Sequence, residues 1–241
     1  DTQYLEQKLQ QTIRIVDYFC HGKKEVGIAV DEWGVWHPQA NLESGLFQQN
    51  TLRDAILAGV VLNMFNRHST KVKMANIAQT INVLQSLCLA KGEETVLTPT
   101  YHVYSLYRGH MGKSAVEVTV DSPPLKMPEQ STNSVKGTSV IRKPNLLDVS
   151  ASIGQEGNRL ILTCVNQDLL GDLDVEVNLV GNKEVDGGEM AILTADDVRA
   201  HNDFGSPKEV EPIRQPIDAS GKKFTKVLPR HSISSLDLRL K

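Results

Sequence analysis

Apolar residues in the first half of the chain alternate between helical spacing and short unbroken runs. Residues 4–20 repeat apolar positions every three or four residues, which predicts an amphipathic helix. The run VGIAV at 26–30 has no alternation and is typical of a strand buried on both faces in a parallel sheet. Residues 51–66 predict a second helix with a capping box at Thr51 and Asp54, and because this helix is apolar nearly all round, we expect it to be covered on two sides.

Three further segments extend this pattern. The residues VKMANIA at 72–78 predict a second buried strand. Helices are predicted at about 80–90 and, opening with Pro99, up to about residue 110. The order helix–strand–helix–strand–helix indicates a parallel α/β sheet or barrel.

The second half of the chain reads as strands, several of which alternate polar and apolar residues. The predicted strands are 114–120, 159–165, 173–180, 189–194, 223–228 and 232–240. Turn residues separate them, which indicates an antiparallel β-sandwich. A stretch with several prolines, 121–144, is predicted to be a surface excursion. We therefore predict an α/β part at 1–112 and an all-β part at 113–241.

Composition excludes several classes of protein. The chain has 26 basic and 29 acidic residues and no basic block, which argues against binding nucleic acid or an anionic membrane. No apolar run approaches the roughly 18 residues that a membrane helix needs. The three cysteines, Cys20, Cys88 and Cys164, are far apart and odd in number, so they indicate neither a disulfide framework nor a metal cluster. A reducing compartment follows most simply, and we predict a cytoplasmic protein, although a first residue other than Met suggests trimming or a fragment.

The carboxylates directly after the first predicted strand are the main candidates for chemistry. Asp31 and Glu32 follow VGIAV, and catalytic groups of βα-barrels project from the carboxyl ends of strands. Trp33 and Trp36, the only tryptophans, lie within four residues of Glu32. An aromatic face beside a carboxylate suits a sugar-binding cleft. The alternative is a strand-end acid that caps the next turn, with tryptophans that fill the core.

The end of the second predicted strand carries two amides, Asn76 and Gln79. Amide side chains recognise hydroxyl groups as both donor and acceptor, although they also serve to satisfy local backbone. The histidines have no HExxH spacing, and GxGxxG, GxxxxGK[ST] and GxSxG are absent from the sequence. No metal and no cofactor are therefore predicted.

Several segments together resemble glycoside hydrolase family 51, the α-L-arabinofuranosidases. In the first half these are AVDEWGVWH, QQNTLRDAILAGVVLNMFNRH, VKMANIAQTINVLQ and TPTYHVYSLYRGH. In the second half they are DVSAS, LTCVNQD and ILTADDVRAHNDFGSP. The resemblance covers essentially the whole chain. It implies the last part of a (β/α)8 TIM barrel followed by a jelly-roll-like antiparallel β-sandwich.

The resemblance also implies an activity and a set of site residues. The family consists of retaining hydrolases. The resemblance implies that the chain acts on terminal α-L-arabinofuranosyl residues of polysaccharides and oligosaccharides. It also implies that Glu32 is the nucleophile. Trp36 would line the arabinose subsite, Gln79 would contact the sugar or the nucleophile, and Trp33 is a candidate second wall. Asp31 would support the strand end. Gly34 stands where the family commonly has Asn.

The chain is predicted to hold only half of this site. The family's acid/base is a Glu after Asn, and no Asn-Glu dipeptide occurs in the 241 residues. Retaining hydrolysis needs two carboxyl groups about 5 Å apart. Asp31 is a poor second carboxyl, because adjacent strand residues point to opposite faces. The chain is thus expected to be inactive without the other half of the barrel, supplied in cis or by a second chain, and the complete enzyme is expected to form a homo-oligomer.

A second function stays open from the sequence. The chain could be a non-catalytic β-sandwich module for binding or assembly, with a barrel remnant attached to it. A second chain that supplies the remaining strands would favour the enzyme.

Overall fold

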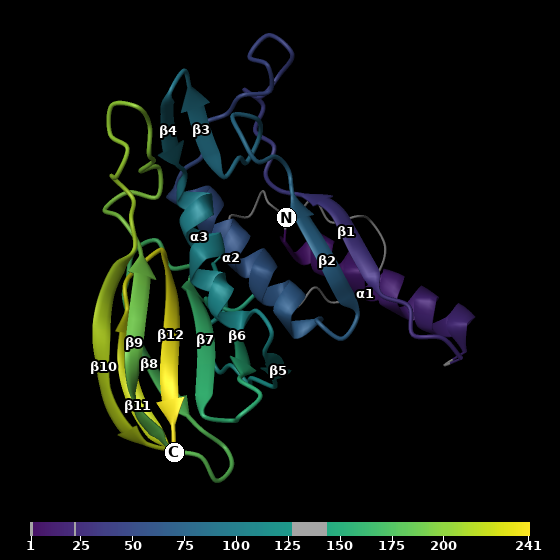
Figure 1. Cartoon of the computed structure of the whole chain (residues 1–241), viewed down its shortest axis with the longest axis vertical. Helices are drawn as coiled ribbons and strands as arrows, with labels where there is room; N and C mark the ends of the chain where they lie inside the picture. Colours follow the sequence, from purple (N-terminus) through teal and green to yellow (C-terminus); the bar gives the residue numbers. More distant parts are fainter. Residues whose placement is uncertain (1, 22, 127–143) are drawn as a thin grey trace.

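The computed structural model describes residues 2–21, 23–126 and 144–241 (Figure 1). A part built of helices and parallel strands lies beside an antiparallel sandwich, and helix α2, Leu52–Arg67, runs between them. The stretch predicted as a surface excursion, 121–144, lies mostly outside the described residues.

The first elements follow the predicted pattern. Helix α1 spans Thr2–Cys20, and strands β1, Ile28–Trp33, and β2, Val72–Ile77, pair in parallel. The start of α2 is held as the capping spacing predicts: Asp54 Oδ2 accepts the backbone N–H of Thr51 at 2.8 Å and its hydroxyl at 3.1 Å. These helix and strand assignments are confirmed. The predicted burial of both strands is wrong, because Ala29 of β1 and Met74 of β2 are exposed and only one face of the pair packs on the core.

The helix predicted at about 80–90 is wrong. The chain there is irregular and then forms a hairpin of β3, Cys88–Lys91, and β4, Glu94–Leu97. Gln85 and Ser86 are fully buried and bonded to distant segments, so a tertiary polar network prevails over local helical spacing.

The next helix is confirmed. Helix α3 spans Pro99–Tyr107, and the 3-10 turn η1, Arg108–His110, continues it. Thr98 caps the helix by accepting the backbone N–H of Tyr101 on its hydroxyl at 3.4 Å, and proline at the first helical position costs no hydrogen bond.

A sandwich of two antiparallel layers forms the second half, as predicted. One layer has six strands in the order β10–β9–β12–β7–β6–β5, and the other is the pair β11–β8. The strands are β5 Ser114–Val116, β6 Leu147–Ile153, β7 Arg159–Asn166, β8 Leu173–Asn178, β9 Val185–Leu193, β10 Ile213–Gly221, β11 Lys223–Leu228 and β12 Ser232–Leu240. The sequence pattern misses β6 and β10. Strand β10 holds Pro216 at the edge of the sheet, where a missing N–H is tolerated.

Helix α2 is covered on two sides, as expected. Ile28 and Ile77 of the parallel pair pack on the same core cluster as Val165 and Ile233 of the large sheet. Gly59 permits the close approach of α2 to that sheet, because an added Cβ would lie 3.0 Å from Val165 and 3.3 Å from Ile233. The division of the chain at residue 112 stays a prediction, since α2 and α3 share this core with the sheet.

A buried polar cluster joins α2 and α3 to the large sheet. Asn63 Oδ1 accepts hydroxyl hydrogen bonds from Tyr107 at 2.7 Å, Ser150 at 2.7 Å and Thr163 at 2.6 Å. Asn63 Nδ2 donates to Asp148 Oδ1 at 2.8 Å. These bonds cross the helix–sheet interface and fix the position of α2, because leaving such buried groups unpaired is costly.

Two titratable groups lie in the same interface. Burial raises the pKa of Asp148, and Arg67 Nη1, 3.0 Å from Asp148 Oδ1, opposes that rise. Burial lowers the pKa of His110 from its usual 6.5 to about 4. The ring nitrogens of His110 lie 2.7 Å from Ser152 Oγ and 3.1 Å from Thr163 Oγ1. The interface therefore holds a neutral histidine at pH 7.

Candidate functional site

The residues singled out from the sequence lie at the carboxyl end of the parallel pair. In the register of β1 and β2, Val30 lies opposite Ala75 and Trp33 opposite Ile77, so both strands end at the same edge. This edge is where parallel α/β folds place functional side chains.

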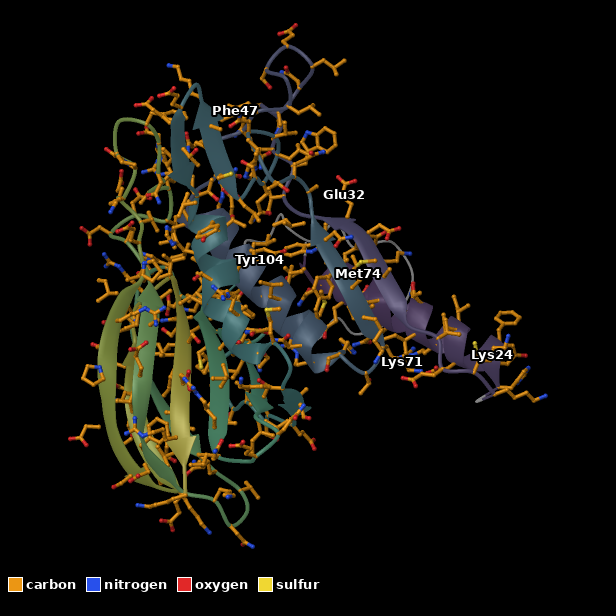
Figure 2. All side chains as sticks on the ribbon, in the orientation of Figure 1. Lys24, Glu32, Phe47, Lys71, Met74 and Tyr104 are labelled. Atoms are coloured by element: carbon orange, nitrogen blue, oxygen red, sulfur yellow. The ribbon has the colours of Figure 1, made fainter. Side chains whose placement is uncertain are left out.

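Glu32 lies next to the last residue of β1 and is exposed, and its side chain projects from that end of the strand (Figure 2). The register shifts between Val30 and Trp33, and Asp31 is exposed as well. The strict alternation used to set Asp31 aside is therefore interrupted here.

The structure separates the two tryptophans. Trp33 is only 5% exposed and packs edge-on to Phe65 at 5.7 Å and against Tyr104 at 6.4 Å between ring centroids. Within the described residues, its Nε1 and the hydroxyl of Tyr104 have no hydrogen-bond partner. The core-filling alternative thus describes the position of Trp33, whose ring offers no open face to a ligand.

Trp36, by contrast, is 62% exposed and lies on the loop that follows β1. Its indole Nε1 donates to the carbonyl of Ala40 at 2.7 Å, which ties the ring to its own loop. The loop leaves β1 through Gly34, whose φ of +147° is a conformation that other residues rarely adopt. An open ring face held by a hydrogen bond is a suitable platform for an apolar sugar face.

The amides of the second strand are exposed. Asn76 lies within β2 and Gln79 just beyond it, on the irregular segment before β3. Gln79 therefore lies beyond the same sheet edge as Glu32.

The sequence gives no sign of the two amides that hold the Trp36 loop. Gln48 and Gln85 are 1% and 0% exposed and bond to the backbone on either side of Trp36. Gln85 lies in the segment predicted as a helix, and its bond to Val35 spans 50 positions along the chain. No local pattern predicts a contact of this separation.

Neither a metal-binding cluster nor a membrane-spanning helix is found in the part of the chain that the structure describes. Across residues 2–21, 23–126 and 144–241, His, Cys, Asp and Glu side chains form no group of three or more that could hold a metal ion. In the same residues, no helix combines the length and the apolar character that crossing a bilayer requires.

The chain matches a known protein family and is similar to several named proteins. Residues 31–232 match the family described as alpha-L-arabinofuranosidase C-terminal domain. An intracellular exo-alpha-L-arabinofuranosidase of Bacteroides ovatus is 32% identical over 98% of this chain, which corresponds to 44% of that relative. A probable alpha-L-arabinofuranosidase C of Aspergillus terreus is 32% identical over 87% of this chain and 39% of its own length.

Solved structures match over nearly the whole chain. The GH51 arabinofuranosidase from Xanthomonas axonopodis pv. citri superimposes with a TM-score of 0.85 at 30% identity, over 99% of this chain and 46% of its own. The alpha-L-arabinofuranosidase from Thermotoga maritima, in an arabinose complex, gives a TM-score of 0.83 at 26% identity, over 98% of this chain and 48% of its own. The chain therefore spans less than half the length of these relatives.

Proposed function

The chain belongs to the family of alpha-L-arabinofuranosidase C-terminal domains, as the sequence resemblance predicted, and on that premise we propose that it carries the nucleophile half of a retaining α-L-arabinofuranosidase. Glu32 is the nucleophile, and Trp36 and Gln79 form part of the arabinose subsite. The substrates are terminal α-L-arabinofuranosyl residues of polysaccharides and oligosaccharides. The names of the Bacteroides ovatus and Thermotoga maritima relatives support this substrate class.

One observation carries the proposal. Glu32 is an exposed carboxylate at the carboxyl end of a parallel strand, beside the end of a second parallel strand, and an exposed tryptophan follows it on the next loop. This is the position from which barrel strands present catalytic groups. Glu32 needs no metal or cofactor for the proposed chemistry.

The parallel pair also supports the proposal that the first part is the end of a (β/α)8 barrel. Parallel sheets are normally covered on both faces. In β1 and β2 one face packs on the core around α2, whereas Ala29, Met74 and Asn76 are exposed. We propose that the remaining barrel, in cis or from a second chain, completes this sheet and supplies the acid/base.

The proposed reaction has two steps. In the first, a Glu32 oxygen attacks the anomeric carbon, the bond from that carbon to the leaving oxygen breaks, and the external acid protonates that oxygen. In the second, the same external group takes a proton from water, whose oxygen displaces Glu32 from the anomeric carbon. Two inversions retain the configuration of the sugar.

The proposal extends to the location and assembly of the complete enzyme. A cytoplasmic enzyme is proposed because the Bacteroides ovatus relative is named intracellular and the cysteines of this chain form no disulfide. The homo-oligomer suggested by the family resemblance is proposed for the complete enzyme, of which this chain is one part.

Complementation tests the proposal. The chain is mixed, or co-expressed, with the segment of the Bacteroides ovatus relative that it does not match, and release of 4-nitrophenol from its α-L-arabinofuranoside is followed. The mixture is expected to be active and the chain alone inactive. Glu32→Gln in the mixture should lower turnover at least about 1,000-fold, on the order of 4 kcal/mol of barrier. Asp31→Asn, the matched control, should keep more activity than Glu32→Gln.

Three outcomes would count against it. Turnover by the chain alone that disappears in Glu32→Gln would place the acid/base within these residues. Full activity of Glu32→Gln in the mixture would remove Glu32 as nucleophile. A stable mixture without turnover, together with arabinan binding by the chain, would favour the non-catalytic module.

A further inference from the structure

Two buried glutamines fix the backbone on both sides of Trp36. Gln85 Oε1 accepts the backbone N–H of Val35 at 2.8 Å. Gln48 Oε1 accepts the N–H of His37 at 2.9 Å, and Gln48 Nε2 donates to the carbonyl of Val35 at 2.9 Å. Both peptide groups that flank Trp36 are therefore held by side chains that water does not reach.

Each glutamine also reaches a second structural element. Gln85 Nε2 donates to the carbonyl of Asp54 at 2.8 Å and to Thr100 Oγ1 at 3.2 Å, so it ties the loop to the first turns of α2 and α3. Gln48 Nε2 additionally lies 3.3 Å from Asn50 Oδ1, just before α2. Both N–H groups and the oxygen of each amide are therefore engaged in hydrogen bonds.

The side chain of His37 adds a third anchor. Its Nε2 lies 2.8 Å from Asp54 Oδ1, and Asp54 is 1% exposed and also accepts the N–H of Thr51 at the start of α2. This contact fixes the loop after β1 to the first turn of α2, a helix that packs in the core.

We propose that Gln48 and Gln85 are positioning residues that clamp Trp36 in place as the sugar platform, an inference that rests on the proposed function of Trp36. An alternative path of the loop would leave the buried amide oxygens of both glutamines, and one N–H of Gln48, without the partners they have here, which is unfavourable. The exposed indole thus keeps a defined orientation without burying its own surface. An aromatic platform fixed before the ligand arrives loses less freedom on binding than a mobile one.

Time-resolved fluorescence tests the clamp without any sugar. Only two tryptophans are present, so Trp33→Phe leaves Trp36 as the single reporter. In this background, Gln48→Met and Gln85→Met remove the amides at similar volume. The fast component of the nanosecond anisotropy decay should rise in amplitude about twofold or more in both, because the ring then moves with its loop.

A matched control separates loss of the clamp from loss of stability. Asn166 is also a fully buried amide, and its Nδ2 donates to Leu228 and Pro229 in the sandwich. Asn166→Leu should lower the free energy of unfolding without changing the anisotropy of Trp36. An unchanged fast amplitude in both glutamine variants, with the fold retained by circular dichroism, would overturn the proposal.

If the glutamine variants do not fold, hydrogen exchange of the unaltered chain tests the clamp instead. The amides of Val35 and His37 should exchange at least about 100-fold more slowly than in an unstructured peptide. Exchange of both at the unprotected rate would overturn the clamp. Neither readout involves Glu32 or substrate, so a failure of the proposed enzyme activity leaves these results unaffected. In the complemented enzyme, the same variants should raise KM more than they lower kcat.

Discussion

The large antiparallel sheet and the parallel pair differ in how many of their faces are covered. One face of the six-stranded sheet packs on a core that β8 and β11 close, and the opposite face packs against α2 and α3. The parallel pair rests on the same helical core with one face only, and its other face presents Ala29, Asp31 and Met74 to solvent. Both sheets use one helix, α2, as a shared support.

This difference indicates which sheet has both of its faces covered by residues of this chain. The sandwich satisfies both faces of its sheet from within the chain, whereas a two-stranded parallel sheet with one open face is stable only beside a larger core. The catalytic carboxylate that we propose lies on the incompletely covered sheet. The polar cluster around Asn63 and the tight approach at Gly59 anchor this exposed part to the sandwich.

The largest effect on stability is expected for a substitution in the core that α2 shares with the large sheet. Ile233 of β12 is fully buried where α2 crosses the sheet. Ile233→Ala should lower the free energy of unfolding by about 2–5 kcal/mol, because the helices cannot collapse onto the cavity. Urea unfolding followed by circular dichroism measures this change. A loss below about 1 kcal/mol would mean that α2 does not depend on the sheet.

Acid should weaken the same interface. An unfolded chain protonates His110 near its usual pKa of 6.5, but the folded chain only at about 4, so unfolding takes up a proton between these values and stability falls as the pH falls. The loss is roughly 2–3 kcal/mol after allowance for partial exposure. The lowered pKa of His102 acts in the same direction, and the raised pKa of Asp148 acts in the opposite one.

His110→Gln is the variant that isolates this contribution. Its unfolding free energy, measured by urea titration between pH 7 and pH 4, should depend less on pH than that of the parent chain. An equal slope in both proteins would show that His110 is not the group that titrates.

The smallest effect on stability is expected for a substitution on the exposed face of the parallel pair. Met74 of β2 is 50% exposed and lies outside the described core clusters, so Met74→Ala should change the stability of the chain by less than about 0.5 kcal/mol. In the mixture with the complementary segment, the same substitution should weaken assembly, because the face is then covered. An equal affinity of parent and Met74→Ala chains in a pull-down titration would argue that this face stays open.

Sequence reasoning succeeded where structure is locally determined. The apolar spacing of α1 and α2, the unbroken runs of β1 and β2 and the Thr51–Asp54 cap depend on neighbours in sequence. The exposure of Glu32 and Trp36 is compatible with the strand-end argument. Trp33 could not be separated from Trp36 by composition, because its burial depends on packing against Phe65 and Tyr104, which lie far along the chain.

The failures have a common physical cause, which is interaction between distant residues. Gln85 bonds to Val35 and Asp54 and holds an irregular path where spacing predicted a helix. Strand β10 is stabilised by pairing with β9 despite Pro216, which weakens any local strand signal. Such contacts leave no periodic trace in the sequence.

Covalent trapping tests the central claim, that Glu32 is the nucleophile, most directly. The reagent is 2,4-dinitrophenyl 2-deoxy-2-fluoro-α-L-arabinofuranoside, whose leaving group departs without a general acid, so that the first step does not depend on an acid/base carboxyl. The chain, alone and mixed with the complementary segment, is digested and its peptides are weighed by mass spectrometry. The account predicts one fluoroarabinosyl group on Glu32 in the mixture, present in Asp31→Asn and absent in Glu32→Gln. A label on another residue, equal labelling of Glu32→Gln, or no labelling of the assembled mixture would contradict it.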